Sequence, residues 1–276
     1  MIKHLWLLIS VLLFLPAGQA PVPQASSKES NQEINLAPLF KGYQGAFVLL
    51  DVERKSYVRY RPEQCAERLS PMSTFKIPNS LISLELGVVP NANQITKWDG
   101  TDYGNPGWNR NHNLASAFAA SALWYYQRLA EKVGAERMRE YVQKIHYGNE
   151  DTSGGITQFW LNTSLKISAD EQVEFLRRFV QDELPFSART ASIVKKIMIV
   201  DKNGRVVLRG KTGSAATNNR RILNWFVGYL ERDGKTYIFA TNIKGQDIPD
   251  RNTARQITEA ILKEMKLWAS TAARAK

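Results

Sequence analysis

Residues 71–78 read Pro-Met-Ser-Thr-Phe-Lys-Ile-Pro, and this stretch decides both the expected fold and the expected chemistry. Ser73 and Lys76 stand three residues apart, and apolar residues with helical spacing continue as far as Gly87. On a helix this separation places both side chains on one face, with Cβ atoms about 5–6 Å apart. We therefore predict Ser73 as a nucleophile and Lys76 as the base that takes its proton. Pro78 predicts a bend in the same helix.

The serine–lysine spacing is not specific by itself, because Ser192 and Lys195 share it. The second pair belongs to a segment with the pattern of an ordinary amphipathic helix, whereas Phe75 and Ile77 give the first pair apolar neighbours. A lysine acts as a base only when its amine is neutral, and burial lowers its reference pKa of about 10.4. The assignment of Lys76 therefore depends on the groups that surround it.

A second candidate segment is the tripeptide Lys211-Thr212-Gly213, which follows a strand-like segment. Lys211 and Thr212 would line a groove with a cation and a hydroxyl, which suits a substrate anion. Glycine at 213 would let a ligand approach the backbone closely. The N–H of Ser214 would then join that of Ser73 in an oxyanion hole. The alternative is a strand end with a solvated lysine.

The remaining sequence predicts strands near both ends of the chain and helices between them. Apolar runs bounded by turn residues predict strands at 46–50, 56–60, 197–200, 206–208, 225–230 and 236–240, with turns at 201–204 and 233–234. Helical periodicity predicts helices that include 129–133, 138–145, 168–180 and 256–265. The first should stop at Gly134, and the third opens with a capping box. The expected fold class is α+β (mixed α and β): an antiparallel sheet flanked by helices, with a helical lobe inserted at roughly 88–196.

Residues 1–20 have the pattern of a signal peptide. A short basic start precedes an unbroken apolar run at 5–15, and small residues precede a predicted cut after Ala20. The run is shorter than a membrane-spanning helix, so we expect export and no membrane attachment after cleavage; the alternative is an uncleaved anchor. Residues 21–276 are then expected to form one catalytic domain, with a polar lead-in at 21–37.

Composition narrows the partners and cofactors. The formal net charge is +11, but basic residues alternate with acidic ones, as at 131–132 and 136–137, so we expect no nucleic-acid partner. Cys65 is the only cysteine, which excludes an intramolecular disulfide, and we expect it to be a small buried apolar side chain. Outside the predicted signal peptide the only histidines are His112 and His146, so we expect no metal site.

Five short motifs occur in an order and at approximate spacings that one enzyme family shares. They are Ser73-Thr74-Phe75-Lys76, Ser121-Ala122-Leu123, Tyr147-Gly148-Asn149, Phe159-Trp160-Leu161 and Lys211-Thr212-Gly213. From about Gly45 to Leu267 the chain thereby resembles the class D (oxacillinase-type) serine β-lactamases. Leu123 departs from the family pattern, which has valine there. Tyr103-Gly104-Asn105 repeats the tyrosine motif, so only the spacing from Ser73 favours the later copy.

The resemblance implies the serine β-lactamase and penicillin-recognising transpeptidase-like fold. It implies an exported, periplasmic enzyme that hydrolyses the β-lactam amide of penicillins and related antibiotics through an acyl-serine, conferring antibiotic resistance. Carbon dioxide is expected to carbamylate Lys76, with no other cofactor, and the indole N–H of Trp160 is expected to hold the carbamate. Leu123 and Leu161 would contribute to the apolar pocket that lowers the lysine pKa.

The resemblance also assigns the remaining roles. Ser121 would relay a proton to the leaving nitrogen, Lys211 would supply positive potential, and Thr212 with Arg255 would hold the substrate carboxylate. Arg255 is preferred to Arg251 because Arg255-Gln256-Ile257 opens the last helix as in the family. Two alternatives remain: a penicillin-binding or β-lactam-sensing protein that is acylated without turnover, and a basic binding protein with no chemistry. The β-lactams preferred and the oligomeric state are left open.

Overall fold

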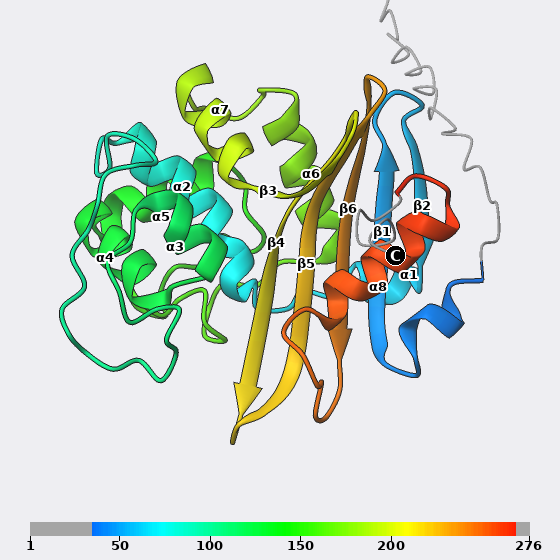
Figure 1. Cartoon of the computed structure of the whole chain (residues 1–276), viewed down its shortest axis with the longest axis horizontal. Coiled ribbons are helices and arrows are strands. Elements are labelled where there is room, and N and C mark those ends of the chain that lie inside the picture. Colours follow the sequence, from blue (N-terminus) through cyan, green and yellow to red (C-terminus); the bar gives the residue numbers. More distant parts are fainter. Residues whose placement is uncertain (1–34, 269–276) are drawn as a thin grey trace, which may run out of the picture.

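The computed structural model describes residues 35–268, which Figure 1 shows coloured along the chain. The predicted signal peptide at 1–20 and most of the lead-in predicted at 21–37 lie outside the described residues. Among residues 35–268, no helix is both long enough and apolar enough to cross a membrane.

One antiparallel sheet forms the centre of the fold, with six strands in the order β2-β1-β6-β5-β4-β3. The strands are β1 (Gln44–Asp51), β2 (Ser56–Tyr60), β3 (Ile199–Asn203), β4 (Val206–Thr217), β5 (Arg220–Arg232) and β6 (Lys235–Lys244). The N-terminal strand β1 pairs with β6 from the other end of the sheet-forming sequence. The predicted antiparallel sheet built from distant segments, and with it the α+β fold class, is confirmed.

Helices cover both faces of this sheet (Figure 1). The helices are α1 (Pro62–Cys65), α2 (Lys76–Glu85), α3 (Leu114–Ala120), α4 (Leu123–Val133), α5 (Ala135–Lys144), α6 (Ala169–Val180), α7 (Ala188–Ile197) and α8 (Thr253–Glu264), with 3-10 helices η1 (Ala37–Phe40) and η2 (Met72–Phe75). The larger hydrophobic core joins one face of the sheet to α2–α7, and the smaller one joins the other face to α8 and η1. Each strand of the sheet centre must therefore be apolar on both faces.

Strand β1 shows why its sequence is a continuous apolar run. Val48 and Leu50 belong to the larger core, whereas Phe47 and Leu49 belong to the smaller core on the opposite face. Successive side chains of a strand point to opposite faces, so a strand covered on both sides needs apolar residues at every position. Cys65 packs in the larger core, and burial raises the pKa of its thiol to about 12, which confirms it as a buried apolar side chain.

Several predicted helix and turn signals are confirmed. Ser168 Oγ accepts a hydrogen bond from the Glu171 N–H at 3.1 Å, and the Glu171 carboxylate accepts one from the Ser168 N–H at 2.8 Å, so the capping box opens α6. Gly134, with φ 83°, ends α4. Asp233 and Gly234 form the two-residue turn between β5 and β6, both with positive φ, as a hairpin of this length requires.

The predicted hairpin around residues 201–204 is wrong in its turn and in its length. Asn203 pairs with Val206, so the two turn residues are Gly204 and Arg205, and β4 continues to Thr217. The Asn203-Gly204 pair led to a turn that was predicted too early in the sequence, because Asn203 still belongs to strand β3. Pro78 is the third residue of α2, and a proline in the first turn of a helix removes no helical hydrogen bond. Just before Pro78 the chain changes from the 3-10 helix η2 to the α-helix α2.

Candidate active site

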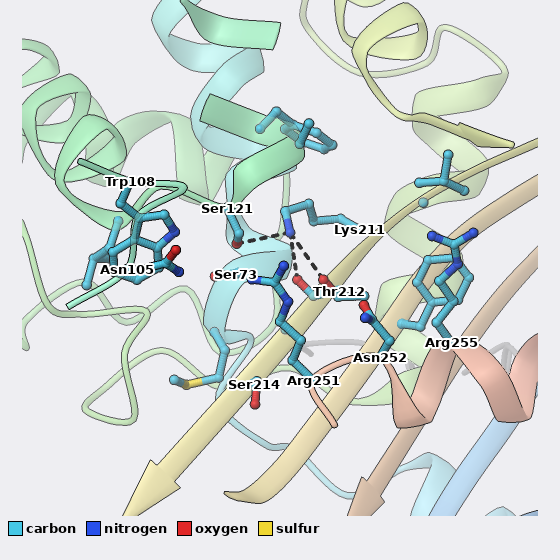
Figure 2. A pocket seen from close by; sticks show the side chains of 18 of the residues that line it. Ser73, Asn105, Trp108, Ser121, Lys211, Thr212, Ser214, Arg251, Asn252 and Arg255 are labelled. Atoms are coloured by element: carbon cyan, nitrogen blue, oxygen red, sulfur yellow. Dashed lines mark hydrogen bonds between the residues drawn. The ribbon is translucent and has the colours of Figure 1, made fainter. Parts of the chain in front are cut away.

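A cavity of about 560 Å³ opens where η2, the α3–α4 junction, β4 and the segment that leads into α8 meet. Figure 2 shows its lining side chains. Of the residues predicted from sequence, those that line the cavity are Ser73, Ser121, Leu123, Leu161, Lys211, Thr212, Gly213, Ser214 and Arg255. Lys76 and Trp160 are not among the lining residues; both are buried, and Trp160 belongs to the larger core. The fold therefore gathers in one place residues that are far apart along the chain.

Ser73 and Lys76 are in direct contact at the step from η2 to α2. Lys76 Nζ and Ser73 Oγ are joined by a hydrogen bond of 2.8 Å. Lys76 is 1% exposed, and burial first, then the charge of Lys211, hold the pKa of the Lys76 amine well below its usual value. Met72, immediately before Ser73, has φ 51°, a strained conformation for a non-glycine residue of the kind found at functional sites. This geometry allows a neutral amine to take the hydroxyl proton.

Lys76 Nζ lies 5.2 Å from the centroid of the Tyr126 ring, and further aromatic rings pack around the neighbouring Phe75. The Phe75 ring stacks on Trp160 with centroids 5.5 Å apart and meets Phe159 edge-on at 4.9 Å. The Trp160 carbonyl accepts hydrogen bonds from the Met72 N–H at 3.1 Å and from Ser70 Oγ at 3.1 Å, which ties the Trp160 loop to η2. Trp160 Nε1 is buried and has no hydrogen-bond partner among the described residues. A buried donor without a partner is costly and calls for an explanation.

Lys211 connects the sheet to the α3–α4 junction. Its Nζ donates to Ser121 Oγ at 3.1 Å and to the Thr212 carbonyl at 3.0 Å, with Thr212 Oγ1 at 3.4 Å (Figure 2). Ser121 is the C-cap residue of α3, and its backbone lies in the left-handed region with φ 57°. Its side chain therefore projects from the end of the helix. Burial first, and then the positive charge of Arg251, lower the pKa of Lys211 to about 7. Lys211 can therefore exchange a proton near neutral pH.

Gly213 is required by the approach of two chain segments. Strand β3 pairs with β4 only as far as Arg209, so the outer edge of β4 from residue 211 onward has no strand partner among the described residues. A Cβ built on Gly213 would lie 2.9 Å from the Pro71 carbonyl oxygen and 3.2 Å from Thr74 Cγ2. The sequence had suggested that a ligand makes this close approach. The structure adds a second reason for glycine, because η2 itself packs against the β4 edge at this point, and the approach of a ligand to Gly213, which lines the cavity, stays a prediction.

The Tyr147-Gly148-Asn149 motif is connected through Gln172 to η2, the 3-10 helix that carries Ser73. The buried Tyr147 hydroxyl donates to Gln172 Oε1 at 3.4 Å, and Gln172 Nε2 donates to Thr74 Oγ1 at 2.9 Å. Gly148 has φ +60°, and a Cβ there would collide with the backbone carbonyl of Lys166. The motif is a tight turn whose tyrosine helps to position η2.

The second serine–lysine pair does not belong to the cavity. It lies on α7, where Lys195 Nζ donates to Asp182 Oδ1 at 2.7 Å and to the Val180 carbonyl at 3.0 Å. Ser192 is exposed. The same spacing thus produces an ordinary surface contact on α7 and a buried contact on α2.

The cavity also contains residues that sequence reasoning did not select. Trp108 forms one wall, fixed by its Nε1 donating to the Ala120 carbonyl at 2.9 Å, and Asn105 lies beside it. Arg251 and Asn252 line the opposite side. The repeated Tyr103-Gly104-Asn105 motif was the signal that could have drawn attention to this wall, but a repeated tripeptide does not show which copy faces the cavity.

Comparison with known proteins places this geometry in a family. The model of the penicillin binding protein transpeptidase domain matches residues 25–265. The chain is 37% identical over 271 residues to a probable β-lactamase, YbxI, of Bacillus subtilis (strain 168), covering 96% of this chain and 99% of that protein. It is also 37% identical over 227 residues to the regulatory protein BlaR1 of Bacillus licheniformis, covering 82% of this chain but 37% of that protein.

A solved class D β-lactamase from Bacillus subtilis has the same fold, with a TM-score of 0.82 and 39% sequence identity. The match covers 86% of this chain and 98% of the solved chain. Identity at this level over nearly the full length of both chains extends the likeness beyond the fold. The chain belongs to the penicillin binding protein transpeptidase domain family and, within it, to the class D β-lactamases.

Proposed function

We propose that this chain hydrolyses the amide bond of β-lactams through an acyl-serine intermediate on Ser73 and so confers resistance to these antibiotics. The observation that carries the proposal is the 2.8 Å contact between Ser73 Oγ and the buried, pKa-lowered amine of Lys76, at the wall of a cavity that also contains Lys211. A serine hydroxyl attacks a carbonyl readily once an adjacent base removes its proton. Membership in the class D β-lactamases supports the β-lactam ring as the substrate.

We propose further that Lys76 works in its carbamylated form. Addition of carbon dioxide requires a neutral amine, which the burial of Lys76 favours, and an oxygen on the adduct would find a donor in the unpartnered Trp160 Nε1. When present, the carbamate supplies a carboxylate-like general base for acylation and for hydrolysis of the acyl-serine. Leu123 and Leu161 line the cavity and would limit the access of bulk water.

Ser121 and Lys211 are proposed to deliver the proton that the leaving nitrogen needs. Because Ser121 Oγ accepts its hydrogen bond from Lys211, its own proton is free to be donated. A pKa of about 7 lets Lys211 replace that proton at neutral pH. Each event moves a proton over one hydrogen bond.

The oxyanion hole is proposed to consist of the backbone N–H groups of Ser73 and Ser214. Both residues line the cavity, and Ser214 Oγ is engaged by Asn224 Nδ2 at 3.0 Å, which holds that part of β4 in place. Each donor of this kind contributes about 3–4 kcal/mol to the stability of the transition state. Thr212, with an arginine from the α8 side of the cavity, is proposed to bind the substrate carboxylate; sequence reasoning selected Arg255 for this role.

Export to the periplasm is also proposed, on the sequence pattern of residues 1–20. Expression of the full chain in a Gram-negative host, followed by fractionation and N-terminal sequencing, tests it. A mature protein that begins at Pro21 in the periplasmic fraction is expected. Retention of Met1 in the membrane fraction would show an uncleaved anchor.

The function is tested by hydrolysis of a chromogenic cephalosporin with and without added bicarbonate. Ser73→Ala should abolish turnover, and Lys76→Ala should lower it at least about 100-fold, the smaller end of what a general base contributes. The chain offers a matched control on α7, because Ser192→Ala and Lys195→Ala alter the same spacing away from the cavity and should leave turnover unchanged.

Intact-mass spectrometry after mixing with substrate separates the alternatives. A hydrolase releases product over many turnovers. A chain that gains the mass of one opened β-lactam on Ser73 and releases no product would instead be a penicillin-binding or regulatory protein. Turnover that survives Ser73→Ala would overturn the mechanism.

A further inference from the structure

Ser70 lies two residues before η2, where three parts of the fold meet. Its Oγ donates to the Trp160 carbonyl at 3.1 Å and accepts from the Asn162 N–H at 2.7 Å. Its own carbonyl accepts from Trp225 Nε1, on β5, at 2.9 Å. Ser70 is 3% exposed. One small residue thus joins the segment that leads to the nucleophile both to the central sheet and to the loop of residues 145–168, which carries Trp160 between α5 and α6.

The turn directly after Trp160 depends on the Ser70 hydroxyl. Asn162 has φ 62°, in the left-handed region that non-glycine residues adopt only where their surroundings hold them. Its N–H is held there by Ser70 Oγ. Because Asn162 is exposed, water can replace Ser70 as the acceptor, and the turn can then move. The hydroxyl therefore fixes where this turn lies on the nucleophile segment.

Backbone contacts connect the same two segments independently of the hydroxyl. The Met72 N–H donates to the Trp160 carbonyl at 3.1 Å. Leu69 and Ile167 form an antiparallel bridge, with N–H to carbonyl distances of 2.9 Å and 2.8 Å. These bonds and the bond to the Ser70 carbonyl remain when the side chain is shortened. We therefore expect Ser70→Ala to fold, with a change confined to the placement of the turn.

The placement of this turn matters because of the indole beside it. The Trp160 ring stacks on Phe75, the residue before Lys76, with centroids 5.5 Å apart. Trp160 Nε1 is buried without a partner among residues 35–268. A donor that waits for a group formed later stabilises it only when the donor is already held in place. A hydrogen bond weakens steeply when its donor is misaligned, so a small shift of the turn is sufficient to weaken it.

We infer that Ser70 is a positioning residue whose hydroxyl holds the turn after Trp160 and thereby keeps the indole N–H where an oxygen on modified Lys76 needs it. The inference rests on the proposed function for the reaction and for the carbamate. Ser70 contacts no reacting atom and acts through Trp160. Loss of the hydroxyl should therefore lower the carbamylated fraction of Lys76 while the nucleophile itself is retained.

The test measures turnover of a chromogenic cephalosporin against bicarbonate concentration. A neutral hydrogen bond contributes a factor of about 3 to 10, so Ser70→Ala should raise the half-maximal bicarbonate concentration by about this factor. Saturating bicarbonate should restore kcat, a recovery that a general loss of structure would not show. Ser70→Thr keeps the hydroxyl and should lie closer to wild type. An unchanged half-maximal concentration in folded Ser70→Ala would overturn the inference.

A double variant shows whether Ser70 acts through the indole. In a Trp160→Phe background, Ser70→Ala should cause no further rise in the half-maximal bicarbonate concentration, because the donor that it positions is already gone. Rises that multiply independently would contradict the inference. Thr258→Val is the control, since it removes a buried hydroxyl that lies 2.6 Å from Thr241 Oγ1 between α8 and β6. It should lower stability and leave the bicarbonate dependence unchanged.

The indole N–H signal in 15N NMR of tryptophan-labelled protein separates this inference from the proposed function. The Trp160 signal is identified by its loss in Trp160→Phe. Without bicarbonate or substrate, Ser70→Ala should shift this signal and leave that of Trp268, in the smaller core, in place. Thr258→Val should not move the Trp160 signal. A shift in Ser70→Ala would support the inference even if the wild type failed to hydrolyse β-lactams, whereas an unchanged signal would overturn it even if hydrolysis proceeds as proposed.

Discussion

The replacement Trp160→Phe tests the role of the unpartnered indole N–H. Phenylalanine keeps an aromatic ring against Phe75 and Phe159, whose centroids lie 5.5 Å and 5.0 Å from that of Trp160, and it removes only the donor and part of the ring. In the unmodified protein Trp160 Nε1 has no partner among the described residues, so losing it removes no protein hydrogen bond. The cost to stability should therefore come only from the cavity that the smaller ring leaves, and the protein should remain folded.

The carbamate, by contrast, should lose most of its stabilisation. A hydrogen bond to a charged acceptor contributes about 1.5–3 kcal/mol, which corresponds to roughly 10- to 150-fold in the equilibrium between carbamate and free amine. The bicarbonate concentration that gives half-maximal turnover should rise by about this factor. At a fixed low bicarbonate concentration, kcat should fall by up to the same factor, because hydrolysis of the acyl-serine loses its base.

The assay is the carbamate signal in 13C NMR after addition of labelled bicarbonate, together with the acylated fraction measured by intact mass. The chain provides a matched control in Trp268, whose buried Nε1 also has no partner among the described residues but which belongs to the smaller core. Trp268→Phe should leave the bicarbonate dependence unchanged. Equal carbamate signal and equal kcat in Trp160→Phe and wild type would refute the role of the indole.

Gly213→Ala should destabilise the fold by about 1–3 kcal/mol and slow acylation more strongly, because its Cβ would press on the Pro71 carbonyl that precedes Ser73. Urea unfolding and acylation rates check this. Gly245→Ala, where the nearest neighbour of an added Cβ is at 3.4 Å, is the control. The Lys211 pKa falls from 10.5 to about 7 on folding, so between these pH values the unfolded chain binds one proton more than the folded chain. The free energy of unfolding should therefore rise with pH from about 7 to about 10.5. Lys211→Met should flatten that rise in denaturant titrations, and an unchanged slope would contradict the lowered pKa of Lys211. Ser168→Ala removes the cap of α6 and should cost about 1 kcal/mol in thermal or urea unfolding; no measurable cost would mean that packing alone holds the start of α6.

Local sequence signals determined much of the fold. The capping box at Ser168, the helix end at Gly134 and the Asp233-Gly234 turn were predicted because each depends on residues close in sequence. The strand pattern also indicated an antiparallel sheet from both ends of the chain. The turn after β3 was misplaced, because the pairing of Asn203 with Val206 is decided by the neighbouring strand and overrides the local preference of Asn-Gly.

The candidate active site was likewise predicted from the sequence only in part. The sequence alone determined the family resemblance and the candidate pair Ser73 and Lys76, because a three-residue separation on a helix fixes which side chains are neighbours. It could not separate this pair from Ser192 and Lys195, since burial decides the lysine pKa and burial comes from segments distant in sequence. The close approach of η2 to Gly213 was likewise decided only by the tertiary structure, because it depends on the distance between segments that are far apart in the sequence.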